Sequence, residues 1–252
     1  MKPNTRVLAL TWVHSSTGVK LPVRTIDDAL HAVNRDRPHA EQILLCVDGV
    51  HGFGVEAATP HELGCDFLIS GCHKWLFGPR GTGLVWARPS AWNAVTPTIP
   101  SFDLRAITAW IHGNPPASGV PGLPRALATT PGGFHSFEYR WALREAFEFR
   151  REIGRVRAAA RTNELATHLK AGLREIRGVR LVTPDSTALS AGLVCFNVDN
   201  RDPADIVERL YSRGRIVASV TPYASRYVRF GPSILNSVND VDLALRAIQT
   251  VT

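Results

Sequence analysis

Residues 67–83 read FLISGCHKWLFGPRGTG, and this stretch decides the fold. An apolar run of strand type leads into Lys74 and Trp75, and a glycine-proline turn follows. Residues 44–54 (LLCVDGVHGFG) have the same form, with Asp48 at the end of the apolar run. Because neighbouring parallel strands present functional residues at their C-terminal ends, we expect Asp48 and Lys74 to face one crevice.

The first third of the chain predicts a βαβ arrangement. Apolar segments predict strands at residues 6–13, 43–47, 65–70 and 83–87. Their hydrophobicity is continuous rather than alternating, which is typical of a sheet covered on both faces. Between the first two lies TIDDALHAVN (residues 25–34), which predicts a helix with Thr25 as its N-cap. Strand, helix and strand in this order indicate an α/β fold with a mostly parallel sheet.

The pattern changes after residue 88. Frequent prolines and glycines through residue 131 predict a loop-rich passage, and residues 137–176 predict two helices or one long bent helix. Asp202, followed directly by a proline, predicts a helix start. The tail predicts strands at residues 179–182, 193–198, 216–220 and 227–230 and helices at residues 203–213 and 238–248. We therefore expect two parts: residues 1–132, and residues 133–252 with connecting helices and a small C-terminal α+β domain.

A carboxylate and an amine in one crevice are the two groups that pyridoxal-phosphate (PLP) chemistry requires. The amine of Lys74 would form a Schiff base with the cofactor, and Asp48 would keep the pyridine nitrogen protonated. Trp75 and Phe77 would help to exclude water and favour the neutral amine. In the competing interpretation, Asp48 is a turn residue and Lys74 is an exposed surface cation beside a glycine-proline turn.

Several segments resemble the class V aminotransferases, a fold-type-I family of PLP-dependent enzymes that includes isopenicillin N epimerase and the cysteine desulfurases. VDGVHGFG (47–54) and SGCHKWLFGPRGTG (70–83) are the most specific. WVHSSTGVKLPVRTI (12–26) and TPYASRYVRFGPSILNSVNDVD (221–242) are also similar, and TPGGFHSFEYRWAL (130–143) resembles the epimerase-like branch. The resemblance covers roughly residues 8–248 and implies the fold of PLP-dependent transferases, with residues 1–132 as a partial large PLP-binding domain.

The resemblance also implies roles for individual residues around the cofactor. Lys74 matches the catalytic Schiff-base lysine, and Asp48 matches the partner of the pyridine nitrogen. His51 falls where the family places a Gln or His near the cofactor ring. An ordinary surface or core histidine is the alternative for His51.

Four further residues receive roles by the same resemblance. His73, and less directly Ser70, occupy the stretch that holds the cofactor phosphate, and Ser15 lies where relatives have an Asn near the ring hydroxyl. Arg229, in the segment YVRFGPS, matches the arginine that binds a substrate carboxylate, for which a planar guanidinium is suited. The alternatives are an ordinary histidine for His73, a turn hydroxyl for Ser15 and a surface cation for Arg229.

Two features depart from the family pattern. Relatives have an N-terminal stretch with several strands and a phosphate-binding turn, whereas seven residues precede Leu8 here. A fragment, a misplaced start of the reading frame and a degenerate member are the alternatives, and each leaves a sheet edge open. In addition, a cysteine desulfurase needs a nucleophilic Cys in the loop before the closing arginine. Residues 219–227 contain none, and Cys195 lies in an apolar run, which argues against persulfide chemistry.

The composition argues against several other classes of function. The net charge of +7 raises the possibility of nucleic-acid binding, but basic and acidic residues alternate over residues 144–164, as on a solvated helix. We expect no nucleic-acid partner, no membrane span and no metal site, since the four cysteines lack paired spacing. A cytoplasmic homodimer acting on a small amino-acid substrate is the expectation.

The leading hypothesis is therefore a PLP-dependent enzyme that transforms an amino acid, with Lys74 also moving the α-proton. Epimerisation, transamination and β-elimination stay open. A truncated or inactive homologue that acts as a binding or assembly partner is the second hypothesis. Nucleic-acid binding through the net charge is the third.

Overall fold

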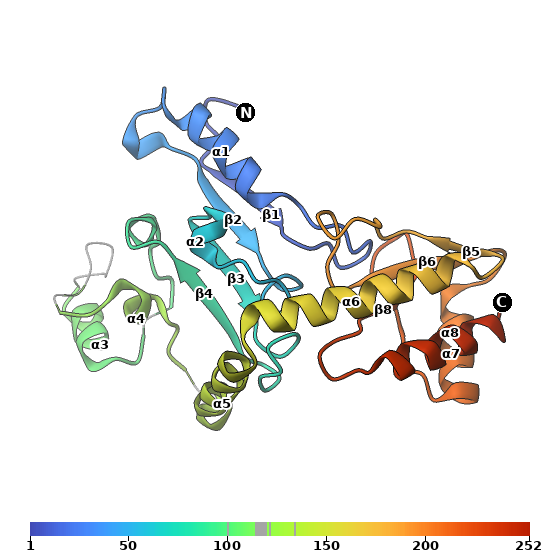
Figure 1. Cartoon of the computed structure of the whole chain (residues 1–252). Helices are drawn as coiled ribbons and strands as arrows, with labels where there is room; N and C mark the ends of the chain where they lie inside the picture. The colour runs from blue at the N-terminus through green and yellow to red at the C-terminus, as the bar shows by residue number, and fades with distance from the viewer. Residues whose placement is uncertain (100, 114–119, 121, 134) are drawn as a thin grey trace.

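The computed structural model describes residues 1–99, 101–113, 120, 122–133 and 135–252 (Figure 1). Two sheets form the framework. The first has the order β1 (Val7–Thr11), β2 (Leu44–Asp48), β3 (Phe67–Gly71), β4 (Gly83–Ala87). The second has the order β5 (Val179–Leu181), β6 (Val194–Val198), β8 (Val228–Phe230), β7 (Ser219–Val220). The strands β1, β2 and β3 are parallel and β4 is antiparallel, which confirms an α/β fold with a mostly parallel sheet.

Helices pack against both sheets, and the long helix α6 extends from one sheet to the other (Figure 1). The helices of the first half are α1 (Val23–Asn34), α2 (Pro60–Leu63), α3 (Leu104–Ile111) and α4 (Arg125–Thr129), with single 3-10 turns η1 (His39–Glu41) and η2 (Ala91–Ala94). The helices of the second half are α5 (Phe137–Ile153), α6 (Arg155–Arg174), α7 (Pro203–Gly214) and α8 (Val238–Gln249). No helix of the described residues is long and apolar enough to cross a membrane.

Most predicted element boundaries agree with the structure within a few residues. Residues 137–176 form two helices, α5 and α6, because Gly154 between them has a φ of 87°, which breaks the helical backbone. Asp202 caps α7, and its side chain accepts a hydrogen bond from the backbone N–H of Ala204.

Three local predictions were wrong or incomplete. Helix α1 begins at Val23 after Pro22, so Thr25 lies inside its first turn and does not cap it. The strand expected at residues 216–220 is only Ser219–Val220, because the N–H of Ile216 bonds to the carbonyl of Leu210 at the end of α7.

The third concerns residues 88–131, which contain helices rather than loops alone. The side chain of Asp103 caps α3, and Pro124 directly precedes α4. A small apolar cluster, built on buried Ala106 and Leu123, holds the two helices together. The predicted loop residues Pro100, Pro115, Pro116, Gly119 and Pro121 lie outside the described residues.

The two faces of the first sheet differ sharply. One face is buried: Leu45, Val47 and Leu68 pack against residues of α1 and α2. Strand residues alternate between faces, so the neighbouring residues lie on the other side. There the side chains of Val7, Ile69 and Val85 are 54%, 43% and 52% exposed. We call this the open face; the expected covering of both faces is not seen among the described residues.

The difference between the faces predicts unequal costs for two adjacent truncations in β3. Leu68→Ala removes a side chain that is 1% exposed, and we expect it to lower the free energy of unfolding by about 2–5 kcal/mol. Ile69→Ala removes a side chain on the open face, with an expected loss of about 1 kcal/mol or less. Urea unfolding of both variants measures this, and equal losses would mean that the open face is covered in solution.

Candidate active site

The ends of β2 and β3 bring the predicted cofactor residues to one edge of the sheet. Asp48 is the last residue of β2 and pairs with Ile69 of β3. Its Oδ1 accepts a hydrogen bond from the N–H of Val50 at 2.9 Å, which shapes the turn toward His51. Lys74 follows the end of β3, and the charge of Asp48 acts to raise the pKa of Lys74. The structure therefore places Asp48, His51 and Lys74 in one region.

A tight loop presents Lys74. The N–H of Gly78 bonds to the carbonyl of Cys72 at 2.9 Å, and the N–H of Phe77 bonds to the carbonyl of Lys74 at 3.2 Å. Phe77 has a φ of 60°, which is uncommon for a bulky residue and costs conformational energy. Leu76 is buried beneath the loop. Packing thus holds the loop in a conformation that Phe77 would not adopt alone.

Lys74 lines a cavity of about 400 Å³ between the two sheets. His51 and Lys74 come from the first sheet and Arg229 comes from β8 of the second. The remaining lining includes apolar side chains and two serines: Trp75, Phe77, Leu193, Val217, Phe230, Ser219 and Ser233. The cavity is therefore built from both halves of the chain.

Positive charge and burial dominate the electrostatics. Nζ of Lys74 lies 3.1 Å from Nε2 of His51. Burial, then the charges of Lys74, Arg229 and His14, lower the pKa of His51 to about 3. Burial and then Arg229 also lower the pKa of Lys74, against a smaller opposing effect of Asp48. The cavity therefore keeps the His51 imidazole neutral and shifts the Lys74 equilibrium toward the nucleophilic amine.

Arg229 is held in place by two contacts. Its Nε donates to Oγ of Ser219 at 3.0 Å, and its Nη1 donates to the backbone carbonyl of Ser15 at 2.8 Å. The hydroxyl of Ser15 donates to the hydroxyl of Tyr223 at 3.3 Å. Ser15 therefore reaches Arg229 through its backbone, and its side chain turns to Tyr223. The sequence alone did not predict a role for Ser219 or Tyr223. The only signal for them in the sequence is their position in the segment before Arg229.

Four predicted residues are not among the described residues that line this cavity: Asp48 and Ser15, whose contacts are given above, and Ser70 and His73. Ser70 is buried, and its hydroxyl donates to the carbonyl of Gly71 at 3.1 Å. It follows Ile69 in β3, so it points to the opposite face of the sheet from Asp48. His73 is exposed beside Gly71. Neither is among the described residues that line the cavity, and their role at a phosphate stays a prediction.

A comparison of the lysines also favours Lys74 as the residue that forms a covalent bond with a cofactor. The sequence has four lysines, all within the described residues. Lys170 is buried and donates to the carbonyls of Pro184 and Asp185 and to Oγ of Ser190, at 2.7–3.0 Å. Nζ of Lys20 is ion-paired with Glu56 at 2.9 Å, and Lys2 is exposed near the N-terminus.

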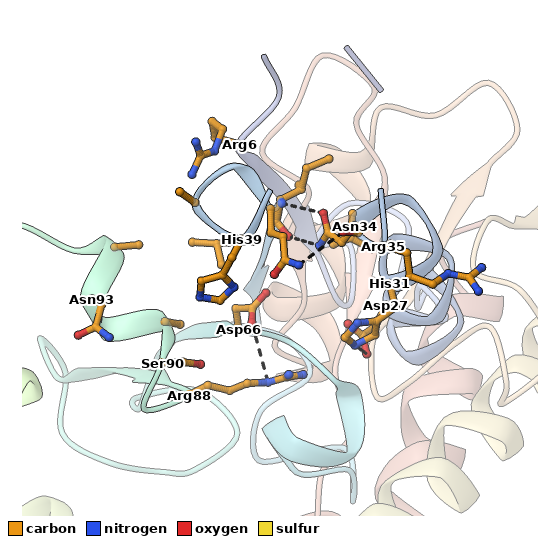
Figure 2. Close-up of a pocket in the computed structure, with 17 residues that line it drawn as sticks. Arg6, Asp27, His31, Asn34, Arg35, His39, Asp66, Arg88, Ser90 and Asn93 are labelled. Atoms are coloured by element: carbon orange, nitrogen blue, oxygen red, sulfur yellow. Dashed lines mark hydrogen bonds and ion pairs between the residues drawn. The ribbon is translucent and has the colours of Figure 1, made fainter. Parts of the chain in front are cut away.

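A second cavity, of about 500 Å³, lies at the amino ends of the parallel strands (Figure 2). Several of its charged side chains form ion pairs with each other or hydrogen bonds with backbone groups. Asp66 accepts the N–H of Leu45 at 2.8 Å, and Arg88 donates to the carbonyl of Cys65 at 3.2 Å and lies 3.9 Å from Asp66. Buried Asp27 lies 3.4 Å from Nε2 of His31, its neighbour in Figure 2. We therefore place the candidate active site at Lys74.

The low pKa of His51 predicts a specific dependence of stability on pH. The unfolded histidine protonates near its ordinary pKa of 6.5, whereas the folded one stays neutral to about pH 3. As the pH falls from 6.5 toward 3, this residue should therefore lower the free energy of unfolding by up to about 1.4 kcal/mol per pH unit. The variant His51→Gln lacks this contribution. Urea unfolding between pH 7 and pH 4 measures the difference, and parallel curves for the two proteins would contradict the assignment.

Comparisons with known proteins agree on one family. The family model for aminotransferase class V matches residues 1–242. Isopenicillin N epimerase of Streptomyces clavuligerus is 28% identical over 100% of this chain and 62% of its own length. A probable cysteine desulfurase of Xylella fastidiosa is 27% identical over 87% of this chain and 48% of its own length. The chain thus spans less than two thirds of these curated relatives.

Solved structures show the same fold. A cystine C–S lyase in complex with its product, cysteine persulfide, has a TM-score of 0.83 and 22% identity, over 99% of this chain and 62% of the lyase. A variant of that lyase, with glycine covalently linked to its PLP cofactor, has a TM-score of 0.81 and 22% identity, over 99% of this chain and 61% of the lyase. PLP is thus the cofactor that the family implies. Together with the match over residues 1–242, these findings establish that the chain belongs to the class V aminotransferase family.

Proposed function

We propose that this chain is a PLP-dependent enzyme of the class V aminotransferase family that acts on an amino acid, with Lys74 as the lysine that binds the cofactor. The observation that supports this most is the cavity in which a half-buried lysine of lowered pKa faces His51 and Arg229. A surface lysine beside a turn would lack these two neighbours and the partial burial. Membership of the family indicates PLP as the cofactor, and the cavity contains residues that would contact it.

The described residues fit two ends of the cofactor. The Lys74 amine would hold it covalently, since neutral amines form Schiff bases with aldehydes. Asp48, at the neighbouring strand end, would hold the proton of the pyridine nitrogen. With that proton in place, the bound ring accepts electrons from a substrate carbanion. A phosphate site is not formed in this cavity by Ser70 or His73.

Arg229 gives the cavity its substrate class. The guanidinium is fixed from behind by Ser219 and Ser15, so the donors that remain can pair with a carboxylate in a defined orientation. The apolar walls of Leu193 and Phe230 would accommodate an amino-acid side chain. The Lys74 amine would also accept and return the α-proton of the substrate.

The raised pKa values of the four cysteine thiols argue against a cysteine nucleophile. Burial raises the pKa of Cys195 to about 11 and that of Cys65 to about 12, so neither presents a thiolate. Burial also raises the pKa values of Cys46 and Cys72. We therefore favour an epimerase, transaminase or lyase reaction over persulfide formation, in keeping with the similarity to isopenicillin N epimerase.

The second candidate function is an inactive homologue that serves as a binding or assembly partner. The exposed apolar residues of the open face favour it, since they offer a surface for another polypeptide.

The leading proposal, a PLP-dependent enzyme, includes a homodimer. The exposed aromatic side chains Phe137, Tyr139 and Trp141 of α5 give such a dimer an apolar contact surface. A cytoplasmic location stays a prediction.

Binding of PLP separates the two candidates. The folded protein with PLP should show the visible absorption band of a lysine-bound cofactor, and Lys74→Ala should abolish the band. Lys2→Ala, an exposed lysine outside the cavity, is the matched control and should retain it. A folded wild-type protein that shows no band would reject the enzyme proposal and favour the assembly partner.

The role of Arg229 predicts a selective loss of substrate affinity. Arg229→Lys keeps the positive charge near Lys74 but loses the planar pairing of the guanidinium. In spectral titrations of the PLP-loaded protein with amino acids, we expect the apparent Kd to rise roughly 10- to 100-fold. PLP binding itself should change little. Arg226→Lys, an exposed position paired with Asp202, is the control; equal effects of both variants would contradict the assignment.

A further inference from the structure

Trp75 follows Lys74 in the chain, yet its ring contacts His51 rather than the lysine. Its indole Nε1 donates a hydrogen bond to Nδ1 of His51 at 3.4 Å. On the other side of the same imidazole, Nε2 lies 3.1 Å from Nζ of Lys74. The three side chains thus form a line in which His51 stands between the indole and the amine.

The chemistry of these groups decides where the imidazole proton lies. An indole N–H is a donor only, so Nδ1 of His51 must be the acceptor in its contact with Trp75. A neutral imidazole carries one N–H, and burial, together with the positive charges of Arg229 and His14, opposes a second proton on the His51 ring. The single hydrogen is therefore on Nε2, where it faces Lys74.

This tautomer has a consequence for the amine. A charged ammonium has three donors and no acceptor, so it cannot pair with an N–H from His51. A neutral amine has a lone pair that accepts this N–H. The charges that face Lys74 are Arg229, which disfavours the ammonium form, and Asp48, which favours it.

Packing prevents the indole from leaving this position. The ring is 9% exposed and is wedged against two glycines of the second half of the chain. A Cβ atom at Gly192 would lie 2.8 Å from Cη2 of Trp75, and one at Gly231 would lie 3.4 Å from it. The hydrogen bond is long, but the ring that makes it is fixed.

We propose that Trp75 is a positioning residue that fixes His51 as its Nε2–H tautomer and thereby holds Lys74 as a neutral amine. The tautomer and the lysine charge are properties of the protein without cofactor. Only their use, in rapid Schiff-base formation by Lys74, rests on the function proposed above.

The test uses the cofactor-free protein. Nitrogen-15 NMR of labelled histidines, with His51 assigned from its loss in His51→Gln, should show a protonated Nε2 and an unprotonated Nδ1 at pH 7. In Trp75→Phe the aromatic packing is largely kept and the N–H is lost. The tautomers should then mix, and the pKa of Lys74, from the pH dependence of its labelling by an amine-reactive reagent, should rise by about half to one unit.

Trp86→Phe is the matched control, because Trp86 packs against the same hydrophobic core as Trp75. Among the described residues, no hydrogen bond joins Trp86 to His51. This variant should leave both readouts unchanged. A wild-type His51 protonated on Nδ1 would overturn the proposal, as would an unchanged pKa of Lys74 in folded Trp75→Phe. The wild-type measurement needs no variant, so it stands even if Trp75→Phe fails to fold. Neither readout uses PLP, so a failure to bind PLP is a separate result.

Discussion

The parallel pairing of β2 with β3 is the constraint on which the candidate site depends. Cys46, Val47 and Asp48 lie opposite Phe67, Leu68 and Ile69, and this register aligns the two strand ends. A shift by one residue would turn Asp48 into the buried core and expose Val47. The buried side chains of β2 and β3 oppose such a shift, because they fit against α1 and α2. Packing far from the cavity therefore sets the positions of its reactive groups.

A second set of contacts ties the two halves of the chain together around the segment between β1 and α1. Thr183 donates to the carbonyl of Thr17 at 2.7 Å, and Arg229 donates to that of Ser15 at 2.8 Å. Val19 forms a β-bridge with Ser190, whose hydroxyl accepts from Lys170. These contacts are mainly to backbone atoms. They fix the geometry of the segment while leaving the side chains on its surface free to vary.

The sequence predicted most of the fold, and it predicted that Asp48 and Lys74 lie in one region, for identifiable reasons. Strand and helix positions follow from local hydrophobic patterns and caps such as Asp202, and the convergence of Asp48 and Lys74 follows from parallel strand order. The contacts of Trp75 with His51 and of Arg229 with Ser15 could not be predicted. They join residues that are brought together only by packing.

Side-chain direction was the other limit. Ser70 and His73 lie near Lys74 in sequence, but alternation along β3 turns Ser70 to the helix-covered face, and the following loop leaves His73 exposed. The open face could not be predicted either, since the continuous hydrophobicity of these strands indicated cover on both sides. The apolar residues that carry this pattern, among them Ile69 and Val85, are exposed in the described structure.

The seat of the Trp75 ring against Gly192 and Gly231 also limits how the molecule can move. Any hinge motion that separates the halves has to move these two glycines away from the indole, because Trp75 belongs to the first half and the glycines to the second. Separation of the halves would remove this support from the indole, so its hydrogen bond to His51 would be held less firmly in an open form.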